Sequence, residues 1–184
     1  MKVWFHLFEI TLLFFERVNK KIAQNAGKIF EQDFKSSFND DFWVYRLRDN
    51  AASFGNGDNT RFASSNICDF IIFHDKTKTL YLAELKSTKG TSIPYTMIKD
   101  NQIKGLTVAN KHDVVPCFIF NYREKNNATY FMLIDDFLCM KNELQKKSFN
   151  IQDLEKYGAI YIKSEKKRIR YKYDVNDMVN QTHL

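Results

Sequence analysis

The spacing of apolar residues near the start of the chain predicts a helix. Between residues 22 and 38, apolar side chains recur at intervals of three and four, and they include Phe30, Phe34 and Phe38. Positions at these intervals share one face of a helix, so the pattern predicts an amphipathic helix that packs against a core. A polar triplet at 39–41 predicts where this helix ends.

Farther along, short β-branched and aromatic runs alternate with helical patterns. The runs predict strands over residues 42–47, 67–73, 79–86, 114–122, 129–134, 159–163 and 168–174. The helical patterns cover residues 96–111 and parts of 135–157. A polar turn joins the second and third strands into a hairpin, and the last two strands predict a closing hairpin. Helices interleaved with such strands predict an α/β fold with a mixed sheet.

Composition indicates one folded domain with an affinity for anions. The chain has 184 residues, 44% of them hydrophobic and only two of them proline, which excludes a disordered or collagenous protein. Its net charge of +6 favours a polyanion such as nucleic acid or an anionic membrane surface. The three cysteines form no CxxC pair, which predicts a reducing, cytoplasmic setting. The histidines have no zinc-ligand spacing.

The first 24 residues form a separate apolar segment. Residues 3–15 are strongly apolar, but His6 and Glu9 interrupt them and they are too short to cross a bilayer. No small-residue cleavage site follows, so we expect neither a signal peptide nor a membrane span. We predict an apolar helix over residues 1–24 that covers the core or a partner subunit, and a single domain over residues 25–184.

The first predicted hairpin brings two carboxylates together. If it closes symmetrically about Lys76 and Thr77, Asp69 lies directly opposite Glu84. Like charges about 5 Å apart repel, so an apolar sheet retains them most readily around a cation such as Mg²⁺. Glu84 and Lys86 share a strand face, and Lys86 is then placed to hold or polarise an attacking water. The alternative is that Asp69 is solvated while Glu84 and Lys86 form a weak surface ion pair.

Two polar residues beside helical apolar positions are further candidates. Glu31 lies at the edge of the first apolar stripe, and Gln102 lies between Ile98 and Leu106. Each alone is more often a boundary residue or a satisfied core amide. Combined with the hairpin, they would supply a further metal ligand and an amide that positions water or phosphate.

The closing hairpin is strongly basic. Its cations are Lys163, Lys166, Lys167, Arg168, Arg170 and Lys172, with three tyrosines among them. Such a strand pair predicts contact with a phosphate backbone, and the alternative is an edge that charge protects from aggregation. The polar loop over residues 48–65 supplies Asn56, Asn59 and Arg61 as additional candidate DNA contacts.

The ordered set of motifs resembles the PD-(D/E)xK nuclease superfamily and, more narrowly, the RecU family of Holliday junction resolvases. The matching segments are Asn25-Ala26-Gly27, Phe30-Glu31-Gln32-Asp33, Asp69, Glu84-Leu85-Lys86, Lys89-Gly90-Thr91-Ser92-Ile93-Pro94 and Asp100-Asn101-Gln102-Ile103. A bare D…ExK pattern is weakly specific, whereas its combination with the later motifs is much more so. The similarity covers about residues 25–140.

This resemblance implies a restriction-endonuclease-like fold, in which helices flank a mixed central sheet. It also implies a homodimeric, Mg²⁺-dependent endonuclease that cuts branched DNA during recombination and repair, with Mn²⁺ as a substitute metal. The implied metal ligands are Asp69, Glu84, Glu31 and Leu85, with Lys86 at the attacking water and Gln102 in support.

The sequence also departs from the family in ways that keep two other functions open. Cys68 stands where the superfamily often has proline, and Ala26 replaces an arginine of the family's Asn-Arg-Gly motif. The segment between Phe42 and Asp69 is short for the stalk that such resolvases insert into a junction. The alternatives are a nuclease of the same fold that acts on ordinary duplex or flap DNA, and a non-catalytic nucleic-acid-binding module.

Overall fold

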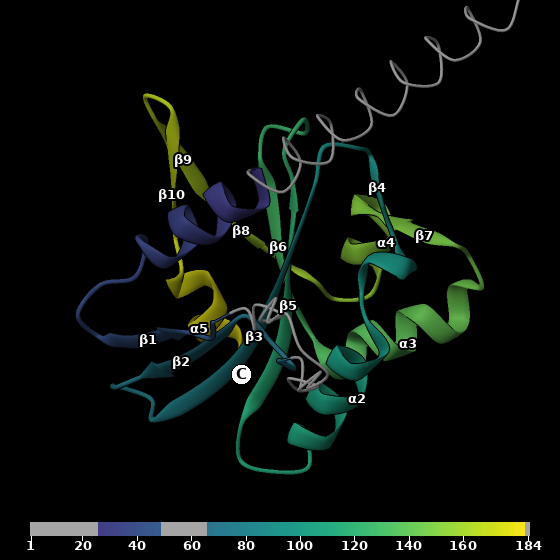
Figure 1. Cartoon of the computed structure of the whole chain (residues 1–184), viewed down its shortest axis with the longest axis horizontal. Coiled ribbons are helices and arrows are strands. Elements are labelled where there is room, and N and C mark those ends of the chain that lie inside the picture. The colour runs from purple at the N-terminus through teal and green to yellow at the C-terminus, as the bar shows by residue number, and fades with distance from the viewer. Residues whose placement is uncertain (1–25, 49–65, 183–184) are drawn as a thin grey trace, which may run out of the picture.

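A six-stranded mixed sheet forms the centre of the protein. The computed structural model describes residues 26–48 and 66–182 (Figure 1). The sheet has the strand order β1-β2-β3-β5-β6-β8. These strands are β1 (Phe42–Arg46), β2 (Phe70–His74), β3 (Thr79–Thr88), β5 (Val115–Tyr122), β6 (Ala128–Leu133) and β8 (Ile160–Ile162). β3 and β5 are parallel and the other neighbours are antiparallel, which confirms the predicted mixed sheet.

Helices cover both faces of this sheet (Figure 1). One face packs against a helix over residues 26–35 and against α5 (Asn176–Thr182). The other face is covered by α2 (Asp100–Ala109), α3 (Ile134–Leu144) and α4 (Ile151–Lys156). Successive side chains of a strand point to opposite faces, so the odd-numbered residues of β5 enter the first core and the even-numbered ones the second.

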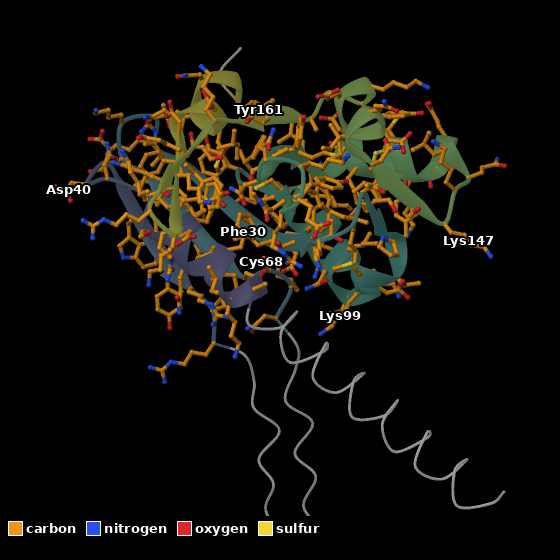
Figure 2. The ribbon with its side chains drawn as sticks, turned by 90° about the horizontal axis from the view of Figure 1, so that it is seen from above. Phe30, Asp40, Cys68, Lys99, Lys147 and Tyr161 are labelled. Carbon is orange, nitrogen blue, oxygen red and sulfur yellow. The ribbon has the colours of Figure 1, made fainter. Side chains whose placement is uncertain are left out.

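Side chains fill the space between the two helical layers. In the view turned by 90°, Phe30 and Cys68 lie toward the middle of the molecule, whereas Asp40 and Lys147 lie at its edges (Figure 2). Phe30 belongs to the core on the first face and Cys68 to the core on the second. No helix in the described ranges is long and apolar enough to span a membrane.

The helical stretches predicted between residues 135 and 157 are two helices, α3 and α4, with a short strand between them. α3 ends at Leu144, where Gln145 adopts a left-handed conformation with φ 48°. A short strand, β7 (Ser148–Asn150), then pairs with β4 (Ser92–Pro94) before Asn150 caps α4. The helix predicted over 96–111 begins later, at Asp100, because a single 3₁₀ turn, η1 (Tyr95–Met97), precedes it.

The closing hairpin was predicted with the wrong first strand, whereas its second strand, predicted over 168–174, is confirmed as β10 (Arg170–Tyr173). Residues 160–162 form β8, which pairs with β6 instead of with the last strand. The hairpin consists of β9 (Ser164–Lys167) and β10 (Arg170–Tyr173), and it projects from the sheet beside the helix over residues 26–35 (Figure 1). Ile162 has an apolar side chain that the central core buries, whereas β9 has no apolar residue to bury. The predicted helix over residues 1–24 lies outside the described residues.

Candidate active site

The register of the β2–β3 hairpin agrees with the sequence prediction. Phe70 lies opposite Ala83 and His74 lies opposite Thr79, as closure about Lys76 and Thr77 requires. Asp69 stands one residue before β2, so it adjoins the ladder where β3 runs on beyond its partner. We call residues 69–88 the carboxylate hairpin.

Main-chain contacts hold Asp69 against β3. Its N–H donates to the carbonyl oxygen of Ala83 at 3.1 Å, and its Oδ2 accepts from the N–H of Leu85 at 2.8 Å. The carboxylate is thereby fixed beside the segment that carries Glu84. The two acids lie close enough to interact, as the spacing predicted, and the negative charge of Asp69 raises the pKa of Glu84.

Glu84 is a buried carboxylate with one oxygen left over. Its exposed fraction is 2%, and its Oε1 accepts from Lys86 Nζ at 2.6 Å and from Gln102 Nε2 at 2.5 Å. Oε2 is also buried and has no hydrogen-bond partner among the described residues. Burial and the charge of Asp69 raise the pKa of Glu84 to about 7, although Lys86 and Gln102 oppose that shift. The Glu84–Lys86 pair therefore forms, but it is not the solvated surface pair of the alternative interpretation.

These features fit a divalent cation. A buried carboxylate that lacks a partner is costly, and a second carboxylate nearby adds repulsion that a cation would neutralise. Oxygen ligands of this kind suit Mg²⁺, which also retains several waters. The described residues contain no group of three or more His, Cys, Asp and Glu side chains placed to hold a metal. Among the described side chains, Asp69 and Glu84 are the candidate ligands here, and a cation would need main-chain, water or phosphate oxygens to complete its shell.

α2 supplies the amide that contacts Glu84. Gln102 lies in the first turn of α2, where its Oε1 accepts from the N–H of Lys99 at 3.0 Å, so that its Nε2 points at the carboxylate. The helix comes very close to the segment that leads into Asp69. A Cβ atom on Gly105 would lie 2.3 Å from Cγ2 of Ile67, so only glycine permits this approach.

Glu31 occupies a different environment from the other candidates. It lies on the helix over residues 26–35, and its Oε2 accepts from Arg46 Nε at 2.7 Å, within a salt bridge. Arg46 pairs with Phe70 across β1 and β2, so this ion pair lies at the same end of the strands as Asp69. The structure thus joins Asp69, Glu84, Leu85, Lys86 and Gln102 through direct contacts, and it binds Glu31 to an arginine. A ligand role for Glu31 stays a prediction.

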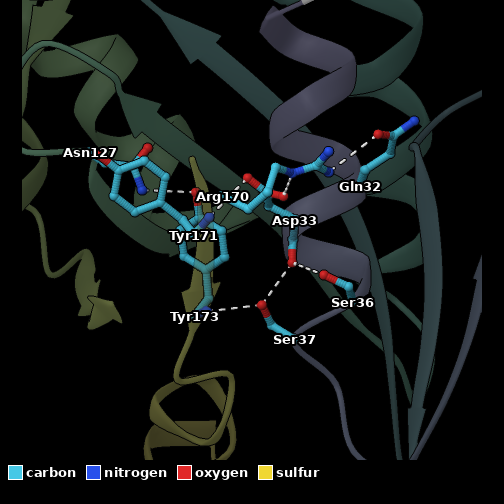
Figure 3. Close-up of polar contacts among 8 residues, drawn as sticks. All are labelled: Gln32, Asp33, Ser36, Ser37, Asn127, Arg170, Tyr171 and Tyr173. Carbon is cyan, nitrogen blue, oxygen red and sulfur yellow. Dashed lines mark hydrogen bonds and ion pairs between the residues drawn. The ribbon is translucent and has the colours of Figure 1, made fainter. Parts of the chain in front are cut away.

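The basic hairpin, β9–β10, displays some of its predicted DNA-binding cations and uses another for anchoring. Lys166, Arg168 and Lys172 are exposed, and Lys167 is paired with Glu165. Arg170 instead forms an ion pair with Asp33, whose other oxygen accepts from the N–H of Tyr171 at 3.2 Å (Figure 3). Arg61, Asn56 and Asn59 lie outside the described residues.

Sequence reasoning missed the anchoring role of Asp33. This residue is almost fully buried, and it lies 137 positions from Arg170 in the chain. The available signal was an acid next to Phe34 in the apolar stripe of the first helix. A buried carboxylate there needs a cation from elsewhere in the fold, and the sequence does not say which one.

Comparison with known proteins identifies the family. Residues 48–177 match the family RecU, described as Recombination protein U. The chain belongs to the RecU family. The SPbeta prophage-derived uncharacterized protein YotM of Bacillus subtilis (strain 168) is 33% identical over 176 residues, and the match covers 86% of this chain and 87% of that protein. A solved structure of Hjc, a Holliday junction resolvase of Archaeoglobus fulgidus, matches with 16% identity and a TM-score of 0.39, over 61% of this chain and 78% of that chain.

RecU membership confirms the resemblance seen in the motifs, including the superfamily of PD-(D/E)xK nucleases. The central mixed sheet flanked by helices confirms the predicted fold class. For this RecU-family protein, membership supports a nuclease of the Holliday junction resolvase kind, and such nucleases typically use a divalent metal.

Proposed function

We propose that this RecU-family protein is a Mg²⁺-dependent endonuclease that hydrolyses phosphodiester bonds in branched DNA. The observation that carries the proposal is the buried Glu84 carboxylate, which has one oxygen without a hydrogen-bond partner in the described chain and lies beside Asp69 and Lys86. A fold retains such a group at a cost to its stability, and catalytic chemistry explains why it is retained.

The residues of the carboxylate hairpin have distinct proposed roles. Asp69 and Glu84 would hold the metal with help from Leu85, and a bound Mg²⁺ polarises the scissile phosphate and makes its water more acidic. The ammonium group of Lys86, 2.6 Å from Glu84 Oε1, holds the attacking water and stabilises negative charge as it develops. Gln102 keeps the Glu84 carboxylate in its orientation. Glu31 joins the ligands in this proposal only if its ion pair with Arg46 opens.

DNA affinity is assigned to the basic hairpin. Exposed lysine and arginine side chains neutralise phosphates and release counterions, which gives sequence-independent binding. Lys166, Arg168 and Lys172 suit this role because they are exposed, whereas Arg170 is engaged with Asp33.

We further propose a two-fold symmetric homodimer. Paired nicks across a four-way junction need two equivalent active sites, which a dimer with two-fold symmetry provides. Light scattering at micromolar concentration tests this, and a strict monomer would contradict both the dimer and the proposed cutting of junctions by paired nicks.

Cleavage of ordinary duplex or flap DNA is the second candidate function. The short segment between Phe42 and Asp69 favours it, because a stalk that enters a junction needs a longer insertion. The contacts among Asp69, Glu84 and Lys86 argue against a third, purely DNA-binding function.

A divalent-metal titration distinguishes these functions. Cleavage would be measured on four-way junction, flap and linear duplex DNA, with Mg²⁺, Mn²⁺ or no metal, and with Glu84→Gln as the matched control. We expect metal-dependent cutting of the junction that the variant lacks. Equal rates on linear duplex would favour the second function, and binding without cleavage of any substrate would favour the third.

A further inference from the structure

Arg123 is a half-buried cation at the end of the strand next to the carboxylate hairpin. It follows the last residue of β5, and its N–H donates to the carbonyl oxygen of Thr88 at 2.9 Å. Its Nη1 donates to Ser87 Oγ at 3.0 Å. Ser87 and Thr88 come directly after Lys86, so Arg123 is attached to the end of the strand that carries the proposed chemistry.

Within the described chain, no carboxylate forms an ion pair with Arg123. The neighbouring acid, Glu124, lies 3.4 Å from Lys89 instead. Burial lowers the pKa of Arg123, which is the effect expected of a cation removed from water. An arginine remains charged in proteins, so this position holds a positive charge that the described side chains do not neutralise through a salt bridge.

A buried polar network orients the guanidinium group. Ser87 Oγ donates to Asn121 Oδ1 at 2.8 Å, and Asn121 Nδ2 donates to Asn127 Oδ1 at 2.9 Å. Asn127 Nδ2 in turn donates to the hydroxyl of Tyr173 at 2.9 Å. Because its own proton is directed to Asn121, Ser87 is left to accept from Arg123. The network links the basic hairpin to the strand of Lys86, and it fixes one arm of the guanidinium fork.

A cavity adjoins this guanidinium group. It has a volume of about 200 Å³ and lies between β5, the helix over residues 26–35 and the basic hairpin, with Arg123, Ile29, Ile169 and Tyr171 in its walls. Asp33 also lines it, but that carboxylate is bound to Arg170 and Tyr171 (Figure 3). The walls are otherwise mostly apolar, and among the described lining residues Arg123 is the one charge that lacks a salt bridge, so an anion at this cavity would be bound by that side chain.

We propose that Arg123 binds a backbone phosphate of the DNA. This proposal rests on the proposed function for its ligand, since nucleic acid is the polyanion that a nuclease holds. Ser87 and Asn121 orient Arg123 from the face of the sheet opposite Lys86, so the phosphate would lie on the side of the basic hairpin. The planar fork, with one arm held by Ser87, presents its other N–H groups to the phosphate oxygens.

Phosphate-specific neutralisation tests this assignment. DNA binding would be measured without metal, on a set of duplexes and junctions in which one phosphate at a time is replaced by a neutral methylphosphonate. For the wild type, we expect one replacement to weaken binding by about 10- to 100-fold, the range for a hydrogen bond between charged groups. Arg123→Gln should bind unmodified DNA more weakly by the same factor, and should be insensitive to that one replacement.

Lys125→Gln is the matched control, because Lys125 lies in the same turn, is exposed, and loses the same charge. This control should stay as sensitive to the replacement as the wild type. Arg123→Lys and Ser87→Ala are milder variants for the case that Arg123→Gln does not fold. The first keeps the positive charge, and the second removes only the hydroxyl that accepts from the guanidinium group. Both should fold, as judged by thermal melting, and both should show a reduced response at the same phosphate.

Two results would overturn the proposal. One is an Arg123→Gln protein that keeps the wild-type response at every phosphate, and the other is a folded Arg123→Lys or Ser87→Ala protein with an undiminished response. The binding measurement does not depend on cleavage, so its failure is distinct from that of the proposed function. If the protein cuts no DNA but still loses affinity when one phosphate is neutralised, and Arg123→Gln removes that loss, then the proposed function is refuted and the phosphate site at Arg123 is supported.

Discussion

Two antiparallel hairpins of this protein carry charged residues, and they treat those charges in opposite ways. In the carboxylate hairpin, the side chains of Glu84 and Lys86 are only 2% and 13% exposed. In the basic hairpin, Lys166 and Lys172 lie in water. A charge that is removed from water is costly and is retained for a specific purpose, whereas a charge in water costs little. The proposed cleavage should therefore be sensitive to the loss of a single polar atom in the carboxylate hairpin, whereas DNA affinity should depend on how many charges the basic hairpin keeps.

In both hairpins a carboxylate accepts a main-chain N–H, but only in the basic hairpin does that carboxylate come from another element. Asp69 accepts from Leu85, and Asp33 accepts from Tyr171. Asp33, on the helix over residues 26–35, also forms an ion pair with Arg170 (Figure 3). Asp33 therefore anchors the basic hairpin to that helix, whereas in the carboxylate hairpin Glu84 keeps a buried oxygen without a hydrogen-bond partner among the described residues.

The largest effect is expected from the two carboxylates. Glu84→Gln or Asp69→Asn should lower metal-dependent cleavage by about 1,000-fold or more, since metal catalysis contributes several kcal/mol and each 1.4 kcal/mol is tenfold. DNA binding without metal should persist, because the basic hairpin is untouched. Cleavage and binding would be measured on one substrate. Wild-type cutting by either variant would contradict the catalytic role proposed for the carboxylate hairpin.

Lys86→Ala should lower the cleavage rate by about 100-fold with the fold intact, because a positioned cation stabilises charge at the reacting phosphate. It should also change the pH profile. Without metal the pKa of Glu84 is raised to about 7, so protons compete with the cation for this carboxylate, and at subsaturating Mg²⁺ the rate should rise as pH rises through neutrality. Lys86 lowers that pKa, so removing its charge should move the rise to higher pH.

Single-turnover rates across pH test this prediction, and Gln102→Ala should show a smaller loss. A Lys86→Ala protein with a normal rate and an unmoved profile would reduce this residue to a structural partner of Glu84.

A smaller effect is expected from the basic hairpin. Replacing Lys166, Lys167 and Arg168 together with glutamine should weaken DNA binding and flatten its salt dependence, by about one unit of slope for each phosphate that the hairpin no longer neutralises. The cleavage rate at saturating DNA should survive. Isotherms at several salt concentrations measure the slope. An unchanged slope with reduced solubility would instead support the charged-edge interpretation of this hairpin.

Arg170→Gln is the informative contrast in the same hairpin. It removes one charge, as each of the other substitutions does, but it leaves Asp33 buried without its cation. We therefore expect this variant to lower thermal stability as well as affinity. Equal stability of Arg170→Gln and Lys166→Gln would show that Arg170 is an ordinary surface cation.

The smallest effect tests packing instead of charge. Gly105→Ala should destabilise the protein by about 1 to 3 kcal/mol, because the new methyl group overlaps Ile67 and either α2 or the segment before Asp69 must move. Gly27→Ala is the control, as its methyl group would meet nothing within 4 Å. Chemical denaturation measures both. A fully stable Gly105→Ala protein would show that α2 tolerates a wider separation.

Local pattern was enough to predict the strands of the central sheet and the pairing of the first hairpin. The alternation of side chains along a strand and the short turn at 75–78 together determine the register, so Asp69 and Glu84 were brought together correctly from spacing alone. The same alternation put Glu84 and Lys86 on one face of β3. These are short-range properties, and the chain encodes them within about twenty residues.

Only the tertiary structure decided which distant residues cover one another. The sequence did not reveal that β8 pairs with β6, that Arg46 binds Glu31, or that Arg170 binds Asp33. Nor did it indicate that Ser87 accepts from Arg123. Periodicity predicts which face of a helix or strand is buried, but it does not predict which other residues pack against that face. Partners that are distant in the chain meet only when the packing of all the layers brings their backbones together.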